Sequence, residues 1–333
     1  MAKSRTRIQL LVIPEGDRTP GRPLLTNIVR AMSELDQGTN ADAEPDQSPN
    51  SPREHGHGYA DRDPAAWLPG AVLDAEIFIP AVLDHLQSKV DVGHPGRIVD
   101  IGCGPGAGTL ELAKRFPNAE LVGLDIGEAA LEIAATRAAA EGVADRVRFI
   151  RADFDHDMTH FLEPVDLVFA SMSLHHTEDP GAALGRACAL ATPGGRLVVA
   201  EFGRPLRAWP EDHQVTTTGL WRRWQAASDA ARLDHLGEAA LNVNWLELLR
   251  AERLDDVKQF ECDVSFPAPV GRRERDWLVN GLNRGLQHHG DGLAAADRAA
   301  LEALLNTDDA VGLPNSSEAM IDTSRMIYTG IRR

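Results

Sequence analysis

Short runs of apolar residues recur along the middle of the chain, separated by segments in which apolar and polar positions mix. Runs this uniformly apolar are typical of strands that are buried on both faces, as in a parallel sheet covered by helices. The pattern therefore predicts an open, doubly wound α/β sheet, with a ligand at the carboxyl ends of the strands. The runs are RIVDI at 97–101, AELVGLD at 119–125, VRFIRAD at 147–153, VDLVFAS at 165–171 and RLVVAEF at 196–202.

Helical signals fill the gaps between these runs. Pro117 closes one segment, and an Ala-rich segment ends at Gly142, a natural residue to follow a helix C-terminus. The residues Pro-Gly-Gly at 193–195 predict a turn before the fifth run. A sixth strand is expected at 257–266, and 324–333 is expected to form a final strand at the edge of the sheet. Helices are predicted at 71–86, 108–117, 128–142 and 179–190, and helical stretches at 205–255 and 271–306.

Composition narrows the class of function. The formal net charge is −16, and an acidic chain repels phosphate backbones. The three cysteines, Cys103, Cys188 and Cys262, are widely spaced, which argues against a disulfide framework and fits a reducing cytoplasm. The apolar run at 8–13 is too short for a signal peptide, and no stretch approaches membrane-spanning length. We therefore expect a cytoplasmic protein without nucleic-acid or membrane partners; a homodimer is compatible with these features.

A glycine-rich turn follows the first apolar run. Residues Gly102 to Ala107 match the pattern G-x-G-x-x-[GA], and Asp125 ends the next run 23 residues after Gly102. This is the spacing expected of a carboxylate that binds a ribose. Glycine is needed at such a turn because a β-carbon would keep a nucleoside away from the backbone. A tight turn without a ligand is the simpler alternative, and the strand-turn-helix context favours a nucleoside cofactor.

The charges around this turn indicate which nucleoside cofactor is bound. Asp100 lies two residues before Gly102, where a carboxylate would repel the pyrophosphate of a dinucleotide and attract an ammonium or a sulfonium. Asp153 ends the third run and can accept a hydrogen bond from the exocyclic amine of adenine. Acids at the ends of three successive strands favour a cationic adenosyl cofactor.

Five motifs in this order and spacing resemble those of the class I S-adenosylmethionine-dependent methyltransferases. They are VDIGCGPGAGTLELA, LVGLDIG, VRFIRADF, VDLVFASMSLHH and LATPGGRLVVAEF. The likeness is nearest to the small-molecule branch that contains the quinone-biosynthesis C-methyltransferases, and it covers about residues 65–265. It implies a Rossmann-like, seven-stranded sheet whose last strand is antiparallel, with S-adenosyl-L-methionine as cofactor.

The resemblance also implies which residues hold the cofactor. Asp100 and the backbone of the glycine turn would hold the methionine part, and Asp125 would hold both ribose hydroxyls. Ile126 would lie against the adenine, Asp153 would contact its amino group, and Phe154 would pack on the ring or donate its N–H. The implied set is Asp100, Gly102, Cys103, Gly104, Gly106, Asp125, Ile126, Asp153 and Phe154, with Ser171 at the methyl-bearing end.

The domain boundaries follow from composition. Residues 36–65 have few large apolar side chains and many Pro, Asp, Asn and Gly, so they cannot bury enough surface to offset their ordering entropy. We therefore predict an N-terminal arm and flexible linker at 1–64 and a methyltransferase domain at 65–333. Its cofactor-binding core is expected at about 95–204, with helical acceptor-binding insertions at about 205–255 and 268–318. The sequence leaves open whether Met1 or Met32 is the true start.

Two histidines are the candidates for catalysis. His175 and His176 follow the fourth run at the edge where the methyl group would lie, and either can act as a general base near neutral pH. The alternative is that they only shape the pocket, because an already nucleophilic carbon or amine needs positioning alone.

Other clusters suggest weaker hypotheses. Asp155, His156, Asp157 and His160 resemble metal ligands superficially and fit a polar surface loop better, so no metal site is predicted. The stretch Glu54–Tyr59 could bind a metal adventitiously, or close over the cofactor as a lid.

The acceptor site must be built by residues beyond the shared motifs. Trp221 and Trp224 are three residues apart and so share one face of a helix. The tryptophans of this region could line a pocket for a planar or hydrophobic acceptor, or form the core of a helical cap, which we favour. Its arginines fit a solvated face better than an anion site. The residues are Trp209, Trp221, Trp224, Trp245 and Trp277, with Arg222, Arg223, Arg272, Arg273 and Arg275.

The leading hypothesis is methyl transfer to O, N or C of a small organic acceptor, in secondary or quinone-like metabolism. RNA and protein acceptors are the runner-up within the same chemistry, although the asparagine-proline-proline-aromatic signature of nucleic-acid amine methylation is absent after the fourth run. A nicotinamide-dependent oxidoreductase and a non-catalytic cofactor-binding protein are the alternatives from other classes.

Overall fold

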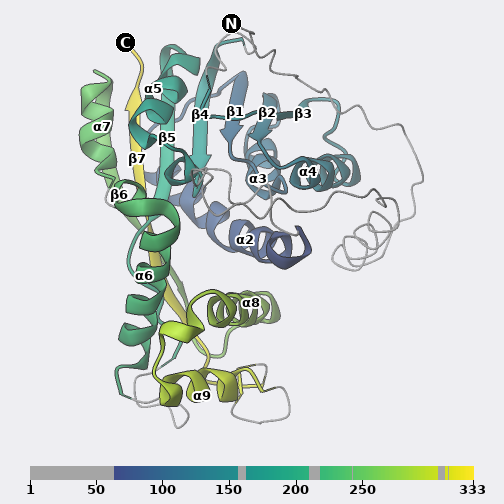
Figure 1. Ribbon diagram of the computed structural model, residues 1–333. Coiled ribbons are helices and arrows are strands. Elements are labelled where there is room, and N and C mark those ends of the chain that lie inside the picture. Colours follow the sequence, from purple (N-terminus) through teal and green to yellow (C-terminus); the bar gives the residue numbers. More distant parts are fainter. Residues whose placement is uncertain (1–63, 157–162, 210–217, 242, 307–311, 314) are drawn as a thin grey trace, which may run out of the picture.

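The computed structural model describes residues 64–156, 163–209, 218–241, 243–306, 312–313 and 315–333. Within these residues the strands form one seven-stranded sheet in the order β3-β2-β1-β4-β5-β7-β6 (Figure 1). The first five strands are parallel, and β7 is antiparallel to both of its neighbours. The strands are β1 Arg97–Ile101, β2 Glu120–Asp125, β3 Val147–Arg151, β4 Val165–Ser171, β5 Ala191–Phe202, β6 Asp255–Phe266 and β7 Ile321–Ile331.

Helices cover both faces of the parallel strands (Figure 1). One face packs against α2, α3 and α4, and the other against α5 and α7. None of the described helices combines the length and the hydrophobicity needed to cross a bilayer. The helices are α2 Pro64–Lys89, α3 Ala107–Arg115, α4 Glu128–Ala140, α5 Pro180–Leu190, α6 Leu220–Leu241, α7 Trp245–Ala251, α8 Arg272–His289 and α9 Ala295–Leu304, with short 3₁₀ turns η1 Leu174–His176 and η2 Gly290–Gly292.

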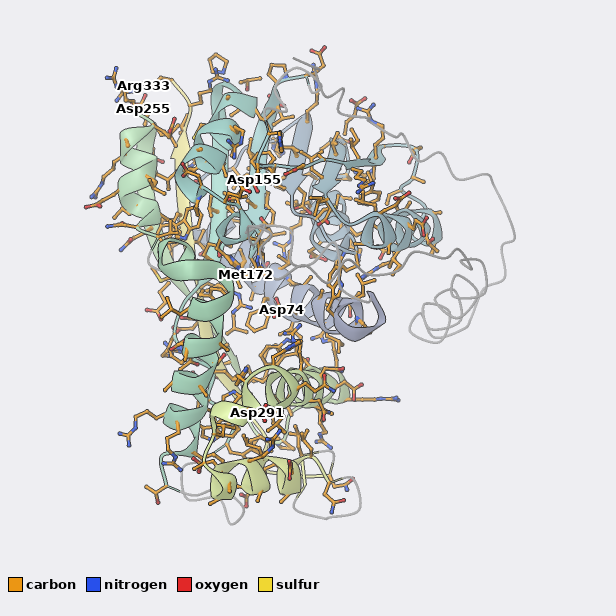
Figure 2. All side chains as sticks on the ribbon, in the orientation of Figure 1. Asp74, Asp155, Met172, Asp255, Asp291 and Arg333 are labelled. Atoms are coloured by element: carbon orange, nitrogen blue, oxygen red, sulfur yellow. The ribbon has the colours of Figure 1, made fainter. Side chains whose placement is uncertain are left out.

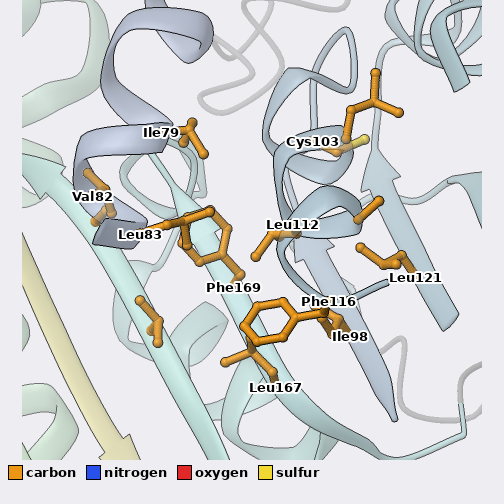
Figure 3. Close-up of a cluster of buried hydrophobic side chains, with 14 of the residues drawn as sticks. Ile79, Val82, Leu83, Ile98, Cys103, Leu112, Phe116, Leu121, Leu167 and Phe169 are labelled. Atoms are coloured by element: carbon orange, nitrogen blue, oxygen red, sulfur yellow. The ribbon is translucent and has the colours of Figure 1, made fainter. Parts of the chain in front are cut away.

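The apolar runs form this sheet because successive side chains of a strand point to opposite faces, and both faces are buried. Ile98 and Phe169 point into the cluster that also contains Leu83 of α2 and Leu112 of α3 (Figure 3). Val99, the next residue of β1, points to the other face, into the cluster formed with α5 and α7. This two-sided burial fixes the register of the central strands.

The sheet has its topological switch at β1, which lies between β2 and β4. From β1 the chain continues to β2 and β3 on one side, and it then crosses to β4 on the other side. The loops that follow these strands therefore diverge at the carboxyl ends of β1 and β4. Asp100 and Asp125 therefore come close to the same opening as Ser171 at the end of β4. The sequence prediction of a doubly wound sheet with an antiparallel last strand is confirmed.

A second hydrophobic core lies below the sheet in the view of Figure 1, where α6, α8 and α9 meet. Trp209 is fully buried there, against Leu278 of α8 and Leu301 of α9. The segment that carries α8 and α9 is inserted between β6 and β7. It brings α8 beside α2, which places a helical cap next to the carboxyl edge of the sheet.

Two sequence expectations about the strands are wrong. The strand predicted at the sheet edge, β7, lies inside the sheet between β5 and β6, and β6 is the edge strand. No residue of β7 is exposed, as expected of a strand that has a neighbour on each side, whereas most residues of β6 are exposed. The turn predicted at 193–195 belongs to β5, because Gly194 donates its N–H to Arg332 and Gly195 accepts from Arg332 as the pairing with β7 continues.

Candidate active site

A cavity of about 1200 Å³ lies where the carboxyl ends of the strands meet α2, α6 and α8. Its walls include His175 and His176 and all but one of the residues predicted to bind the cofactor. Asp74 of α2 and Met172, just after β4, also line it and are labelled in Figure 2. The predicted cofactor residues on its walls are Asp100, Gly102, Cys103, Gly104, Asp125, Ile126, Asp153, Phe154 and Ser171.

The glycine turn has three residues in the left-handed region, with φ of 69° at Gly102, 51° at Gly104 and 77° at Gly106. A β-carbon on Gly102 would stand 2.3 Å from the Cβ of Ser173, and no atom lies within 4 Å of the corresponding position on Gly104. Gly104 therefore leaves open space beside the cavity that it lines, as a close approach of a ligand to the backbone requires.

Gly106 is the predicted site residue that does not line the cavity. It caps the N-terminus of α3, and a β-carbon there would stand 2.7 Å from the Cβ of Ala134 on α4. Glycine is therefore required at this position by the packing of α3 against α4, and not by contact with a ligand in the cavity.

Asp100 is buried at the end of β1, with 3% of its surface exposed. The hydroxyl of Thr109 donates a hydrogen bond to its Oδ2 at 2.7 Å. Burial raises the pKa of Asp100 to about 7, the bond from Thr109 opposes this shift, and the nearby carboxylate of Asp125 adds to it. A buried carboxyl of this kind gains from a cation placed beside it, since the cation favours its ionised form.

Asp125 ends β2 and accepts hydrogen bonds from two backbone N–H groups. Gly104 donates to its Oδ2 and Gly127 to its Oδ1, both at 2.8 Å. Burial raises the pKa of this carboxyl, and the two backbone hydrogen bonds oppose the rise. The side chain thus ties the glycine turn to the residue after β2, and fixes a carboxylate at the wall of the cavity.

The third acid, Asp153, follows β3 and pairs with its own loop. The Nδ1 of His156 lies 3.0 Å from Asp153 Oδ2, and the N–H of Asp155 donates to Oδ1. Asp155 accepts from the N–H of Glu178, so this loop is bonded to the segment that begins α5. The described residues contain no group of three potential ligands placed to hold a metal ion. Asp157, His160 and the stretch Glu54–Tyr59 lie outside the described residues.

His175 forms a buried pair with Glu201. Its Nδ1 lies 2.6 Å from Oε2 of Glu201, and the two side chains are each 4% exposed. The ring of His175 also packs against the rings of His176 and Phe202, with centroids at 4.1 and 5.0 Å. Because Nδ1 is engaged by the carboxylate, Nε2 is the ring nitrogen left for a molecule in the cavity.

Sequence reasoning missed Glu201. It is the next-to-last residue of β5, directly after the apolar residues 197–200, and it is buried. A lone acid near the carboxyl end of a buried strand is itself a signal, because such a carboxylate needs a partner. The partner could not be identified from spacing, since His175 lies 26 residues earlier, on the segment after the neighbouring strand β4.

The tryptophans divide between the cavity and the cores. Trp224 and Trp277 line the cavity, whereas Trp209 and Trp221 stack on each other at 5.6 Å within the second core. Trp245 packs against the face of the sheet covered by α5. Trp209 and Trp221 thus belong to the core of the helical cap, as favoured, whereas Trp245 belongs to the core beside the sheet; Trp224 and Trp277 pack against the cap core and also line the cavity.

None of the arginines singled out from the sequence lines the cavity, and three others do. Arg325 of β7 is buried, lies 3.8 Å above the ring of Phe78, and pairs with Asp74 at 3.2 Å. Trp277 donates its Nε1–H to the same carboxylate at 3.2 Å. Arg204 pairs with three acids at the rim of the sheet. The third, Arg284, is exposed on α8.

A family model described as a methyltransferase domain matches residues 95–245. Trans-aconitate 2-methyltransferase of Pseudomonas aeruginosa is 35% identical over 133 residues, which are 40% of this chain and 46% of that protein. Ubiquinone biosynthesis O-methyltransferase of Proteus mirabilis is 27% identical over 130 residues, 39% of this chain and 51% of that protein. The chain thus spans about half the length of these curated relatives.

Among solved structures, the YcgJ protein from Bacillus subtilis is similar with a TM-score of 0.47 and 18% identity. The match covers 76% of this chain and 97% of that one. A likeness at this level bears on neither substrate nor mechanism.

Proposed function

Residues 95–245 match a methyltransferase-domain model, and from this premise we propose that the chain is a class I S-adenosylmethionine-dependent methyltransferase that methylates a small organic acceptor. The observation that carries the proposal is the ring of carboxylates at one end of the cavity. Asp100, Asp125 and Asp153 stand at the ends of three neighbouring parallel strands, and all three line the cavity. Such a site attracts a cationic adenosyl compound and repels a pyrophosphate.

The residues present fit this cofactor. Gly104 leaves open space beside the cavity, and the buried carboxyl of Asp100 gains a counter-charge when a cation enters. Asp100 would hold the methionine ammonium, Asp125 the ribose hydroxyls and Asp153 the adenine amine. When bound, S-adenosylmethionine would supply a methyl group on a sulfonium: the acceptor atom would bond to the methyl carbon, and the electron pair of the breaking C–S bond would go to sulfur.

His175 would remove a proton from the acceptor. As the acceptor atom bonds to the methyl carbon, its hydrogen passes to Nε2 of His175, and Glu201 stabilises the imidazolium that results. Glu201 acts through His175 and is a positioning residue, while His175 is the catalytic residue. This pair favours an acceptor whose attacking group carries a proton, such as a hydroxyl.

A small acceptor is favoured by the site and by the relatives. The cavity is bounded by α2, α6 and α8, and is lined by few basic side chains for a phosphate backbone. Relatives named for trans-aconitate and for ubiquinone biosynthesis support an acceptor of this size. The chemistry requires that the acceptor gains one methyl group and loses one proton.

Incubation with methyl-labelled S-adenosylmethionine tests the proposal. The chain is offered a metabolite extract, bulk tRNA and bulk protein in separate reactions. We expect label to enter an extractable small compound. Faster labelling of tRNA or protein than of any metabolite would overturn the proposed acceptor class.

A further inference from the structure

The cavity is larger than one cofactor requires. Its volume of about 1200 Å³ exceeds the range of about 300–1,000 Å³ that is usual for a site with one small ligand. The carboxylates lie at the ends of β1, β2 and β3, whereas α6 and α8 form the walls on the side of the second core (Figure 1). The part of the cavity against α8 is therefore available to the acceptor.

Gly281 of α8 borders open space in this part of the cavity. It lies in the interior of the helix and lines the cavity, and a β-carbon there would meet no atom within 4 Å. Glycine inside a helix costs about 1 kcal/mol relative to alanine, so nothing in the helix itself favours it. Its effect is to keep a volume beside the helix backbone empty of side chain.

The walls around this volume are aromatic and apolar. Trp277 lies one helical turn before Gly281, and Leu278 and Leu282 line the cavity with it. Trp224 of α6 closes the far side by lying directly on α8, because a β-carbon on Gly285 would stand 2.3 Å from its Cζ2. Flat aromatic walls favour a planar or polycyclic ligand.

Arg284 places a positive charge at the same wall. It lies three residues after Gly281, and its Nη1 reaches toward α2, to 3.5 Å from the β-carbon position of Gly70. In the part of the chain that the structure describes, no carboxylate pairs with it. The acids on the neighbouring walls are already engaged, Asp74 by Arg325 and Asp229 by the side-chain amide of Gln225.

We propose that the acceptor is an aromatic or polycyclic hydroxyl compound that carries an acidic group. Gly281 gives room for its ring system, and Arg284 binds the acidic group by charge-assisted hydrogen bonds. The inference rests on the proposed function, because it assigns the part of the cavity beyond the carboxylates. Gly281 and Arg284 are then the residues that determine specificity for size and for charge.

Binding of three probes tests the inference in the full chain, by calorimetry with saturating S-adenosylhomocysteine. The probes are phenol, 2-naphthol and 6-hydroxy-2-naphthoic acid. We expect the naphthoic acid to bind about tenfold more tightly than 2-naphthol. Arg284→Gln should abolish this difference. The matched control is Arg272→Gln, because Arg272 lies on the same helix with its side chain 95% exposed and away from the cavity; it should preserve the difference.

The size arm uses Gly281→Leu, with Asn283→Leu on the exposed face of α8 as the control. Gly281→Leu should weaken both naphthalene probes about tenfold and phenol little, and the control should change neither. Gly281→Ala guards against misfolding, since it should raise thermal stability, as alanine does in a helix, and still weaken the naphthalene probes. If Gly281 served only the stability of the fold, Gly281→Ala would not raise thermal stability and weaken probe binding at the same time.

Three results would overturn the inference alone while S-adenosylhomocysteine still binds. They are equal affinity for naphthol and naphthoic acid, equal effects of Arg284→Gln and Arg272→Gln, or unweakened naphthalene binding in both Gly281 variants. Failure of the wild-type chain to bind S-adenosylhomocysteine would instead overturn the proposed function, and this inference with it.

Discussion

The Nδ1 atom of His175 lies 2.6 Å from the Oε2 atom of Glu201, and both side chains are buried beside the cavity. The pair joins the segment after β4 to the end of β5, so two neighbouring strands of the sheet set its geometry. In the proposed mechanism, the carboxylate accepts a hydrogen bond from Nδ1–H, and Nε2 accepts the proton of the acceptor.

Glu201→Gln should lower kcat about 100-fold and leave KM and S-adenosylhomocysteine affinity nearly unchanged. The amide cannot stabilise the imidazolium, but it preserves the shape of the pocket. The measurement is steady-state kinetics with the acceptor isolated from the extract, over a range of pH.

His175→Ala and His176→Ala separate the base from its neighbour. We expect His175→Ala to lose turnover as strongly as Glu201→Gln, and His176→Ala to lose far less, because the carboxylate contacts His175. Unaltered turnover in both histidine variants would contradict the proposed transfer of a proton to a histidine.

Asp100→Asn should stabilise the fold in alkaline solution. The folded pKa of Asp100, about 7, is raised above its ordinary value, so the stability contributed by this group is fully present below about pH 4 and is lost as pH rises through 7. Asparagine avoids that loss, and its side-chain oxygen can still accept the bond from Thr109. Urea unfolding should give a gain of about 4 kcal/mol at about pH 8 that vanishes at about pH 4. A gain of equal size at both pH values would mean that burial of the charge is not the cause.

Gly106→Ala should destabilise the fold by about 3 kcal/mol, from left-handed strain and a clash with Ala134. Gly142→Ala is the matched control, because Gly142 has φ of 71° and no atom near its β-carbon position. It should cost only about 1 kcal/mol. Denaturant titration measures both, and equal costs would show that the packing of α3 on α4 is not what requires glycine.

Asp74→Ala should cost about 3 kcal/mol, because it leaves the buried guanidinium of Arg325 without its carboxylate. Asp255→Ala is the control, since Asp255 pairs with Arg333 in solvent, far from the cavity (Figure 2). That change should stay within about 0.5 kcal/mol. If the two variants lost similar thermal stability, burial of Arg325 would not be what makes its pair with Asp74 stabilising.

The sheet and the carboxylate ring could be predicted because their causes are local. Ile98 and Val99 belong to an apolar run whose side chains point into the cores on both faces of the sheet. Asp100 and Asp125 are acids at the carboxyl ends of two such runs. The order of the last strands could not be read in this way. Whether β6 or β7 lies at the edge depends on long-range pairing, such as Phe202 with Arg325.

The cavity walls beyond the carboxylates were hidden for the same reason. Glu201 and His175 come from two different segments 26 residues apart, and Arg325 lies 251 residues after its partner Asp74. Gly281 and Arg284 lie in a helix with no motif, and only the packing of α8 beside α2 shows that they line the cavity. Chemistry assembled from distant segments leaves little trace in local patterns.

Calorimetric titration with S-adenosylmethionine and, separately, with NAD shows which charge the cavity accepts, because the two ligands present opposite charges to the same carboxylates. We expect a micromolar Kd, of about 10⁻⁵ M or below, for S-adenosylmethionine, at least tenfold weaker binding after Asp125→Ala, and no binding of NAD. Tight binding of NAD with none of S-adenosylmethionine would contradict this expectation.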